Sequence, residues 1–274
     1  MKIQNITNTN NLYKPSFGSL NFKMHQYMDC NGKMRISQCT TAKRDDLNYD
    51  NAADIIIQNF KKYNTVKIMP MNVSDGTEAY FLAESLVRKV GFDEFKKRFT
   101  PIVASDIYAP VIHSYPNNGI VLLSDDEITP FKNDKYKLLK RTNKKLYNKY
   151  ILNPSDKNKK LYKLIPEFKD CFTFMVTDFQ KRLKNLKDNG NSVIIIRNCL
   201  YHSFGEKESV EIVKKVADIL KPNSLFIIGA FDRNKMPNLF METINKYFNE
   251  IETNIFQRKH NLEKFYNYPR SHYI

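Results

Sequence analysis

Residues 66–83, VKIMPMNVSDGTEAYFLA, constrain the fold of this chain more than any other segment. An apolar run of β-type residues enters a polar turn that ends at Gly76, and a helical pattern starts at Thr77. Glu78 places an acidic residue in the first turn of that helix. Glycine permits the tight backbone turn that joins a strand to a helix. The segment therefore predicts a strand, a turn and a helix, the repeating unit of an open α/β sheet.

Two later segments complete the pattern of such a sheet. Residues 102–105, IVAS, form a strand-like run that ends at the carboxylate of Asp106. Residues 193–196, VIII, are a buried type of strand that ends at Arg197 and Asn198. Ligands of an open parallel sheet bind at the carboxyl ends of its strands, so these polar residues are candidates for a binding site. A carboxylate in the position of Asp106 can accept hydrogen bonds from both ribose hydroxyls, which predicts a cofactor that contains adenosine.

The rest of the chain predicts alternating helices and strands. The expected helices cover residues 50–63, 77–90, 109–115, 206–220 and 239–248, and the expected strands residues 66–71, 102–105, 172–176, 193–196 and 225–229. Asp106 follows Gly76 by 30 residues, more than the roughly 20 of a dinucleotide fold, and we assign the extra length to a polar loop over residues 91–100. We predict an α/β fold with a mostly parallel, Rossmann-like sheet and helices on both faces. Residues 251–257 and 265–268 are expected to form a C-terminal antiparallel hairpin.

The composition divides the chain into three parts. Residues 1–35, rich in Asn, Thr and Ser, are expected to form a flexible N-terminal arm, and residues 36–65 a short helical N-terminal element. Residues 66–274 are expected to form the main domain, with a basic insertion at about residues 125–170. We predict that the insertion is peripheral and that residues 131–170 are largely helical.

The net charge of +15 raises the question of a nucleic-acid partner. Residues 131–170 carry 13 Lys and Arg against 4 Asp and Glu, interleaved with tyrosines. Lysine far outnumbers arginine, which is the commoner choice for bidentate contacts to phosphates or bases. A polyanion-binding arm and a solvated, lysine-rich surface both remain open, and nucleic acid is the less favoured partner.

Targeting and metal-binding patterns are both missing from the sequence. It shows no basic-then-apolar leader and no apolar run of about 18 residues, so we expect a cytoplasmic protein without membrane insertion. The four cysteines form no CxxC pair and no Cys/His group at metal-ligand spacing, so we expect free thiols and no metal.

Five segments, in order over about residues 40–232, resemble the motifs of CheR-type methyltransferases. They are residues 40–45, TTAKRD, similar to TxFFRD; 74–80, SDGTEAY, similar to STGEEPY; 104–107, ASDI, similar to ASDID; 196–200, IRNCL, similar to CRNVMIYF; and 220–229, LKPNSLFIIG, similar to LKPGGxLxIG. Each segment is weak alone, and together they are fairly specific.

The resemblance implies a class I methyltransferase fold and S-adenosyl-L-methionine as the cofactor. Enzymes of this family are bacterial and esterify glutamates of chemotaxis receptors. A cytoplasmic enzyme with a protein acceptor, such as a chemoreceptor-like protein, is therefore the expectation.

The resemblance also implies roles for particular residues. Catalytic or acceptor-binding roles fall to Arg44, Arg197 and His202, and cofactor-binding roles to Gln38, Thr40, Gly76, Glu78, Asp106, Ile107, Asp178, Phe179 and Asn198. Glu78 would hold the methionine ammonium of the cofactor and Asp106 its ribose. Asp178 would contact the adenine, with Phe179 packed on the ring. Arg44 would lie beside the reacting methyl group and hold the acceptor carboxylate.

Most of these residues also have an ordinary structural explanation. Asp106 could cap the next helix, Asp178 could simply end a strand, and Arg197 could belong to a structural salt bridge. Arg44 could be part of a charged helix start. His202 could be a base in the pocket or a surface turn residue.

Departures from the family motifs keep two other classes of function open. Asn72 stands where the family has a small residue, Thr77 replaces the first acid of a pair, and His202 replaces a tyrosine. These changes would suit a scaffold protein with a degenerate methyltransferase fold. The basic insertion would suit an RNA methyltransferase. We favour a CheR-like enzyme that methylates a protein carboxylate by glutamate O-methylation.

Overall fold

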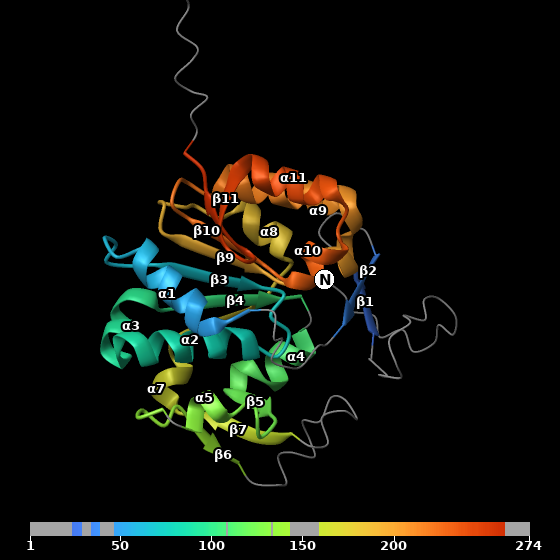
Figure 1. Cartoon of the computed structure of the whole chain (residues 1–274). Coiled ribbons are helices and arrows are strands. Elements are labelled where there is room, and N and C mark those ends of the chain that lie inside the picture. The colour runs from blue at the N-terminus through green and yellow to red at the C-terminus, as the bar shows by residue number, and fades with distance from the viewer. Residues whose placement is uncertain are drawn as a thin grey trace, which may run out of the picture.

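A seven-stranded sheet forms the main body of the protein (Figure 1). The computed structural model describes residues 24–28, 34–38, 47–107, 109–132, 134–142 and 159–260, the first two segments as backbone alone. The strands of the main sheet are β3 (Lys67–Met71), β4 (Ile102–Asp106), β8 (Phe172–Val176), β9 (Ser192–Ile196), β10 (Leu225–Ile228), β11 (Phe248–Glu252) and β12 (Ile255–Arg258). They lie in the order β11-β12-β10-β9-β3-β4-β8.

The direction of the strands confirms the predicted fold class. β10, β9, β3, β4 and β8 run parallel, and β12 is antiparallel to β10 and β11 on either side of it. The chain passes from β3 outward to β4 and β8, and then returns to β9 on the other side of β3. Ligands of open α/β sheets bind at the carboxyl ends of the strands beside such a switch in strand order. The candidate site is therefore expected at the ends of β3, β4 and β9.

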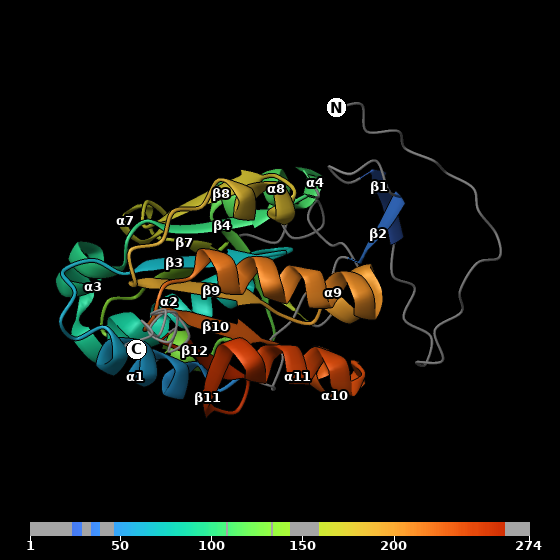
Figure 2. The same ribbon diagram turned by 90° about the horizontal axis from the view of Figure 1, so that it is seen from above.

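Two layers of helices cover the faces of this sheet (Figure 2). One layer contains α1 (Tyr49–Asn59), α2 (Thr77–Val90) and α3 (Phe92–Phe99), and the other α8 (Phe179–Lys184), α9 (Leu200–Ile219), α10 (Ala230–Lys235) and α11 (Asn238–Tyr247). Successive strand residues divide between two cores, because side chains alternate across a sheet. Ile68 and Val193 pack with the first layer, and Met69 and Ile194 with the second.

The prediction of a polar loop over residues 91–100 is wrong, because α3 occupies Phe92–Phe99. Gly91, with φ of 88°, separates α3 from α2. Phe95 and Phe99 are fully buried. The many charged residues between the phenylalanines resemble a loop in composition, while the spacing of the phenylalanines is helical.

A second, smaller sheet combines strands of the basic insertion with one strand that precedes it. Its strands β5 (Ile120–Leu123), β7 (Lys160–Leu164) and β6 (Leu139–Arg141) are antiparallel in this order, accompanied by α4 (Ala109–Ser114), η1 (Pro116–Asn118), α5 (Thr129–Lys132) and α7 (Pro166–Lys169). The prediction of a largely helical segment is wrong for the described residues. Val121 and Tyr162, paired across β5 and β7, pack into the core under the first helix layer. Tertiary packing thus overrides the helical preference of a lysine-rich segment.

Two strand pairs lie toward the ends of the described chain. β1 (Met24–Met28) and β2 (Met34–Gln38) pair antiparallel, within the segments expected to be an arm and a helical element. The C-terminal hairpin consists of β11 and β12, earlier in the chain than predicted. Asn254, with φ of 67°, lies in the turn between them, where asparagine tolerates left-handed backbone. Residues 265–268 lie outside the described residues.

Pro70 lies in the central strand β3, where a proline removes a donor from the hydrogen-bond ladder. Lys67 N–H donates to Asn191 O at 2.9 Å, on the side of β9. In a parallel ladder alternate residues bond to opposite neighbours, so the nitrogen of Pro70 faces β4. Only Met71 and Ser105 pair in register between β3 and β4, consistent with an interrupted ladder.

Arg182 of α8 supplies the donor that Pro70 lacks. Ile102 N–H bonds to Cys171 O beside β8, so the next carbonyl, that of Val103, faces β3. Arg182 donates from Nη2 to Val103 O at 2.7 Å and from Nη1 to Ser105 Oγ at 2.9 Å. Burial lowers the pKa of Arg182 to about 10. The arginine therefore anchors α8 to the backbone of β4.

We expect Arg182→Met to lower the free energy of unfolding by about 2–3 kcal/mol, because it leaves buried acceptors without a donor. Pro70→Val restores a backbone N–H that faces Val103, so the same arginine substitution should cost less in that background. Urea unfolding of the wild type, the two single variants and the double variant measures this difference. Equal costs of Arg182→Met in both backgrounds would contradict the compensation.

Glu84 is an acidic side chain buried in α2, with 1% exposure. Arg88 Nε donates to its Oε1 at 3.1 Å. Burial raises the pKa of Glu84 to about 7, Arg88 lowers it, and the charges of Asp50 and Asp134 raise it further. A carboxyl whose pKa is higher in the folded state holds its proton longer there than in the unfolded state. Its contribution to stability is therefore lost as the pH rises from about 4.5 to about 7.

We expect Glu84→Gln to stabilise the protein at pH 8 by about 1–3 kcal/mol and to have little effect below pH 4.5. The amide keeps an oxygen for Arg88 and carries no charge to bury. Thermal unfolding across this pH range, with Glu94→Gln on α3 as a half-exposed control, measures the effect. A stability gain that does not change with pH would contradict a raised pKa of Glu84 in the folded protein.

Candidate functional site

The turn between β3 and α2 is built on left-handed backbone. Asn72, Ser74 and Gly76 have φ of 57°, 52° and 80°. A Cβ on Gly76 would lie 2.9 Å from the ring of Phe174, so both the conformation and the packing require glycine. Asparagine tolerates this region better than most residues, which explains Asn72 at a position where the family has a small residue.

Asp106 ties the end of β4 to this turn. Its side chain is buried, with 6% of the residue exposed, and its Oδ2 accepts a hydrogen bond from Ser74 N–H at 2.8 Å. Val73 N–H also donates to Ser105 O, at 3.2 Å. The carboxylate is thereby fixed beside the Gly76 turn, at the carboxyl end of its strand.

Arg197 ends β9 as a buried cation with two described partners. Its Nη1 lies 3.0 Å from Glu78 Oε1 and donates to the hydroxyl of Tyr49 at 3.0 Å. Arg197 is 3% exposed, and a buried charge costs several kcal/mol when it is unpaired. Glu78 comes from the first turn of α2 and Tyr49 from the start of α1. The three residues join both helices to the carboxyl end of the central sheet.

Sequence reasoning missed Tyr49. It lies just before the predicted helix, and no motif distinguishes its hydroxyl from a core aromatic residue. Its ring stacks on Phe81 at 5.5 Å between centroids, which a hydrophobic pattern can suggest. The contact with Arg197 is long-range and could not be read from the sequence.

Asn198 and Asp232 connect the end of β9 to α10, the helix that follows β10. Asn198 has φ of 53°, and its Oδ1 accepts from Phe231 N–H at 3.0 Å. Asp232 is fully buried and accepts from Cys199 N–H at 3.2 Å and Tyr201 N–H at 3.0 Å, at the start of α9. These bonds hold the backbone after Arg197, while the role predicted for Asn198 at the cofactor remains a prediction.

Asp178 and Phe179 have structural partners in this protein. Asp178 caps α8, because its Oδ1 accepts from Gln180 N–H at 2.7 Å and Lys181 N–H at 3.3 Å. Phe179 is 3% exposed and packs edge-on against Phe204 at 5.3 Å. Their predicted contacts with adenine remain predictions.

The other predicted residues are described in part or not at all. Ile107 follows Asp106 and is half-buried. His202 lies in α9 and Gln38 ends β2, both described as backbone only. Thr40 and Arg44 lie outside the described residues. The structure thus brings together Gly76, Glu78, Asp106, Arg197 and Asn198 at neighbouring strand ends.

Asp75 links the turn to the basic insertion and was not a predicted site residue. It is 2% exposed, and its Oδ1 accepts from Thr77 N–H at 3.1 Å. Burial raises the pKa of Asp75 to about 6, while the hydrogen bond from Thr77 and the charge of Lys159 lower it. Lys159 also lies 3.7 Å from Glu127 Oε2. The charge of Lys159 in the insertion therefore acts on the carboxyl group of this turn.

The strand order and directions define a class I methyltransferase fold, with the candidate site at the switch in strand order. The family model "CheR methyltransferase, SAM binding domain" matches residues 39–250. The chain therefore belongs to the CheR methyltransferase family and is an S-adenosylmethionine-dependent methyltransferase.

Comparison with solved structures gives distant likenesses. N-methyltransferase NodS from Bradyrhizobium japonicum WM9 is 9% identical with a TM-score of 0.36, over 79% of this chain and 100% of that one. Spermidine synthase in complex with a transition-state analogue is 13% identical with a TM-score of 0.40, over 90% of this chain and 70% of that one. We base no conclusion on likenesses of this strength. No curated protein matches the sequence.

Two features are absent from the described part of the chain. None of its helices is long and apolar enough to cross a membrane. Its His, Cys, Asp and Glu side chains form no group of three or more that could hold a metal ion.

The strand ends suit S-adenosylmethionine. A buried carboxylate, Asp106, beside the glycine turn suits two ribose hydroxyls. Glu78, whose side chain is 19% exposed, offers a negative charge to the ammonium of an amino-acid group. When bound, this cofactor supplies a methyl group activated on a sulfonium.

We expect Asp106→Asn to weaken cofactor binding about 10- to 100-fold, because charge-assisted hydrogen bonds to two hydroxyls become neutral ones. The amide can still accept from Ser74, so the turn should persist. Calorimetry with S-adenosylhomocysteine gives the affinity and circular dichroism checks the fold.

Asp178→Ser, which keeps a capping side chain, tests the second predicted acid in the same assay. Unchanged affinity would assign Asp178 to capping alone, and a loss would support its contact with adenine. An affinity of Asp106→Asn within about threefold of wild type would contradict the placement of the ribose.

Proposed function

We propose that this enzyme methylates a carboxylate of a protein, in the manner of glutamate O-methylation. The supporting observation is that the described carboxylates at the strand ends already have protein partners. Asp106 bonds to Ser74, and Glu78 pairs with Arg197. An amine or hydroxyl acceptor needs a base to remove its proton, whereas a carboxylate is already ionised at neutral pH. Membership of the CheR family supports the same acceptor.

The chain's own residues then have to bind and orient the acceptor and exclude water from the site. An in-line attack requires the acceptor oxygen close to the methyl carbon and aligned with it, which is a matter of positioning. Arg44, outside the described residues, is proposed to hold the acceptor carboxylate. His202 is proposed to line the same side of the pocket.

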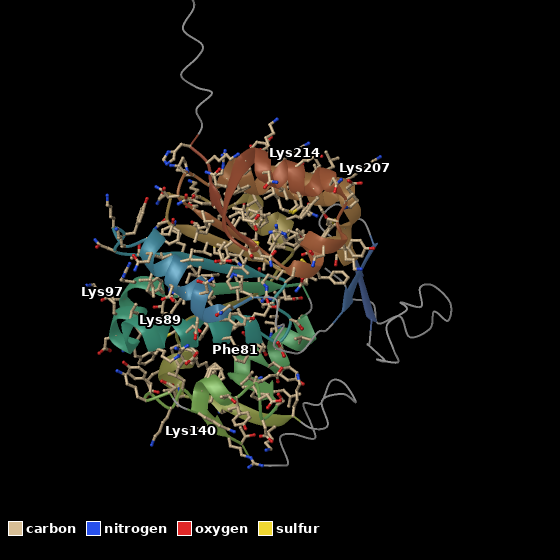
Figure 3. All side chains as sticks on the ribbon, in the orientation of Figure 1. Phe81, Lys89, Lys97, Lys140, Lys207 and Lys214 are labelled. Carbon is tan, nitrogen blue, oxygen red and sulfur yellow. The ribbon has the colours of Figure 1, made fainter. Side chains whose placement is uncertain are left out.

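Lysines of the insertion support an acidic acceptor protein (Figure 3 labels Lys140). Lys140 of β6 and Lys163 of β7 lie directly opposite each other, an arrangement that destabilises a sheet. Lys140 and Lys163 line a cavity of about 390 Å³, and so does Lys169. Asp170 is the acidic residue of its lining. An acceptor rich in glutamate would offset this repulsion. A chemoreceptor-like protein is one such acceptor.

A second cavity adjoins the first at Lys169 and Asp170. It has a volume of about 370 Å³ and also includes Lys169 and Asp170. It extends to Pro116 and Phe174, the residues that contact the position of a Cβ on Gly76. Lys169 therefore lies on a surface that continues from the lysine pair to residues that pack against the Gly76 turn.

The same lysine pair favours a second candidate, methylation of RNA, since a polyanion would offset the repulsion equally well. Labelled S-adenosylmethionine, offered with either the acidic proteins or the RNA of the source cell, separates the two. Carboxyl methyl esters release volatile methanol in alkali, and methylated bases do not. We expect alkali-labile label in protein. Alkali-stable label in RNA would overturn the proposal in favour of the second candidate.

We expect the double substitution Lys140→Glu and Lys163→Glu to raise the KM for a protein acceptor about tenfold or more, through lost charge complementarity. The affinity for S-adenosylhomocysteine should stay within about twofold, because the cofactor site lies at the strand ends. Lys207→Glu with Lys214→Glu on α9 serves as the matched control (Figure 3). An equal rise of the KM in both double variants would show that the effect comes from net charge and not from the position of the lysines.

A further inference from the structure

Tyr49 belongs to α1, outside the strand ends, and is held from two sides. Asn48 caps the helix, its Oδ1 accepting from Asp50 N–H and Asn51 N–H at 3.1 Å each. The ring of Tyr49 stacks on Phe81 of α2 with an interplanar angle of 23°. Only 7% of the residue is exposed. Its hydroxyl therefore has a fixed position relative to both helices.

The hydroxyl meets the ion pair at the end of β9. The same atom, Arg197 Nη1, lies 3.0 Å from the Tyr49 hydroxyl and 3.0 Å from Glu78 Oε1. The guanidinium also lies over the ring of Tyr49, 5.7 Å from its centroid. Tyr49 thus contacts the cation through its ring and its oxygen.

The two members of the ion pair differ in exposure. The side chain of Arg197 is 1% exposed, whereas that of Glu78 is 19% exposed. A cation arriving from solvent can therefore reach Glu78, while Arg197 stays behind it. A closer pairing of Arg197 with Glu78 leaves less negative charge on Glu78 for such a cation. The effect is large because charge interactions are strong in a buried site.

We propose that Tyr49 is a positioning residue for the amino-acid end of the cofactor. By accepting from Arg197, its hydroxyl holds the guanidinium in place and shares it with Glu78. Glu78 is then aligned, and only partly neutralised, for the methionine ammonium. Without the hydroxyl, Arg197 loses this acceptor and turns further onto Glu78. This inference rests on the cofactor lying at these strand ends.

The experiment compares two ligands that differ in one group. S-adenosylhomocysteine carries the amino-acid group, and methylthioadenosine lacks it while keeping the adenosine. We expect Tyr49→Phe, which keeps the ring, to weaken the binding of S-adenosylhomocysteine about 5- to 10-fold, somewhat less than the full value of one hydrogen bond to a charged group. Methylthioadenosine affinity should stay within about twofold, because its contacts lie elsewhere. Tyr63→Phe, beyond the end of the same helix, is the matched control and should change neither affinity.

A second variant tests the coupling between the two residues. Glu78→Gln should also weaken S-adenosylhomocysteine and spare methylthioadenosine. In the Glu78→Gln background, Tyr49→Phe should lower the affinity for S-adenosylhomocysteine by less than about twofold, because both residues act on the ammonium of the ligand. Full additivity would overturn the proposal.

The remaining outcomes separate a failed inference from a failed site. An equal loss for both ligands in Tyr49→Phe would reduce Tyr49 to a structural residue. Unchanged binding of S-adenosylhomocysteine would show that its hydroxyl positions nothing. If neither ligand bound the wild-type protein, the placement of the cofactor itself would fail, and the inference with it.

Discussion

The structure depends on one buried cation, Arg197, at the carboxyl end of β9. A guanidinium this far from water is tolerated only when acceptors surround it, since an unpaired buried charge costs several kcal/mol. Glu78 and Tyr49 meet this requirement from α2 and α1. The end of the strand therefore folds correctly only when both helices are in place. The same interaction gives the candidate site its charge, so stability and binding share one set of contacts.

Other long-range hydrogen bonds hold the remaining strand ends around this centre. Asp106 fixes the end of β4 to the turn after β3, and Asp232 fixes the start of α9 after β9. Arg182 replaces a missing donor at Pro70, so that the sheet can carry a proline in its central strand. Each device uses a buried polar group whose partners come from distant segments. Rigid strand ends of this kind suit an enzyme that works by positioning.

The sequence predicted the parts of the fold that depend on local chemistry. Helix α2 begins at Thr77 and β4 ends at Asp106, as expected, because a left-handed Gly76 and a strand-terminal acid are local signals. The small sheet of the insertion was missed, since its strands are stabilised by packing against the main core. Tyr49 was missed for a similar reason. Its contact with Arg197 joins residues 148 positions apart, and no periodicity reports such a contact.

The most direct test of this account is a crystal structure of the full chain with S-adenosylhomocysteine. The account predicts the ribose hydroxyls within hydrogen-bond distance of Asp106 and the ammonium beside Glu78, with Arg197 still bonded to Tyr49. A ligand bound away from the ends of β3, β4 and β9 would contradict it. So would a ligand in place with Glu78 and Arg197 turned away from its amino-acid group.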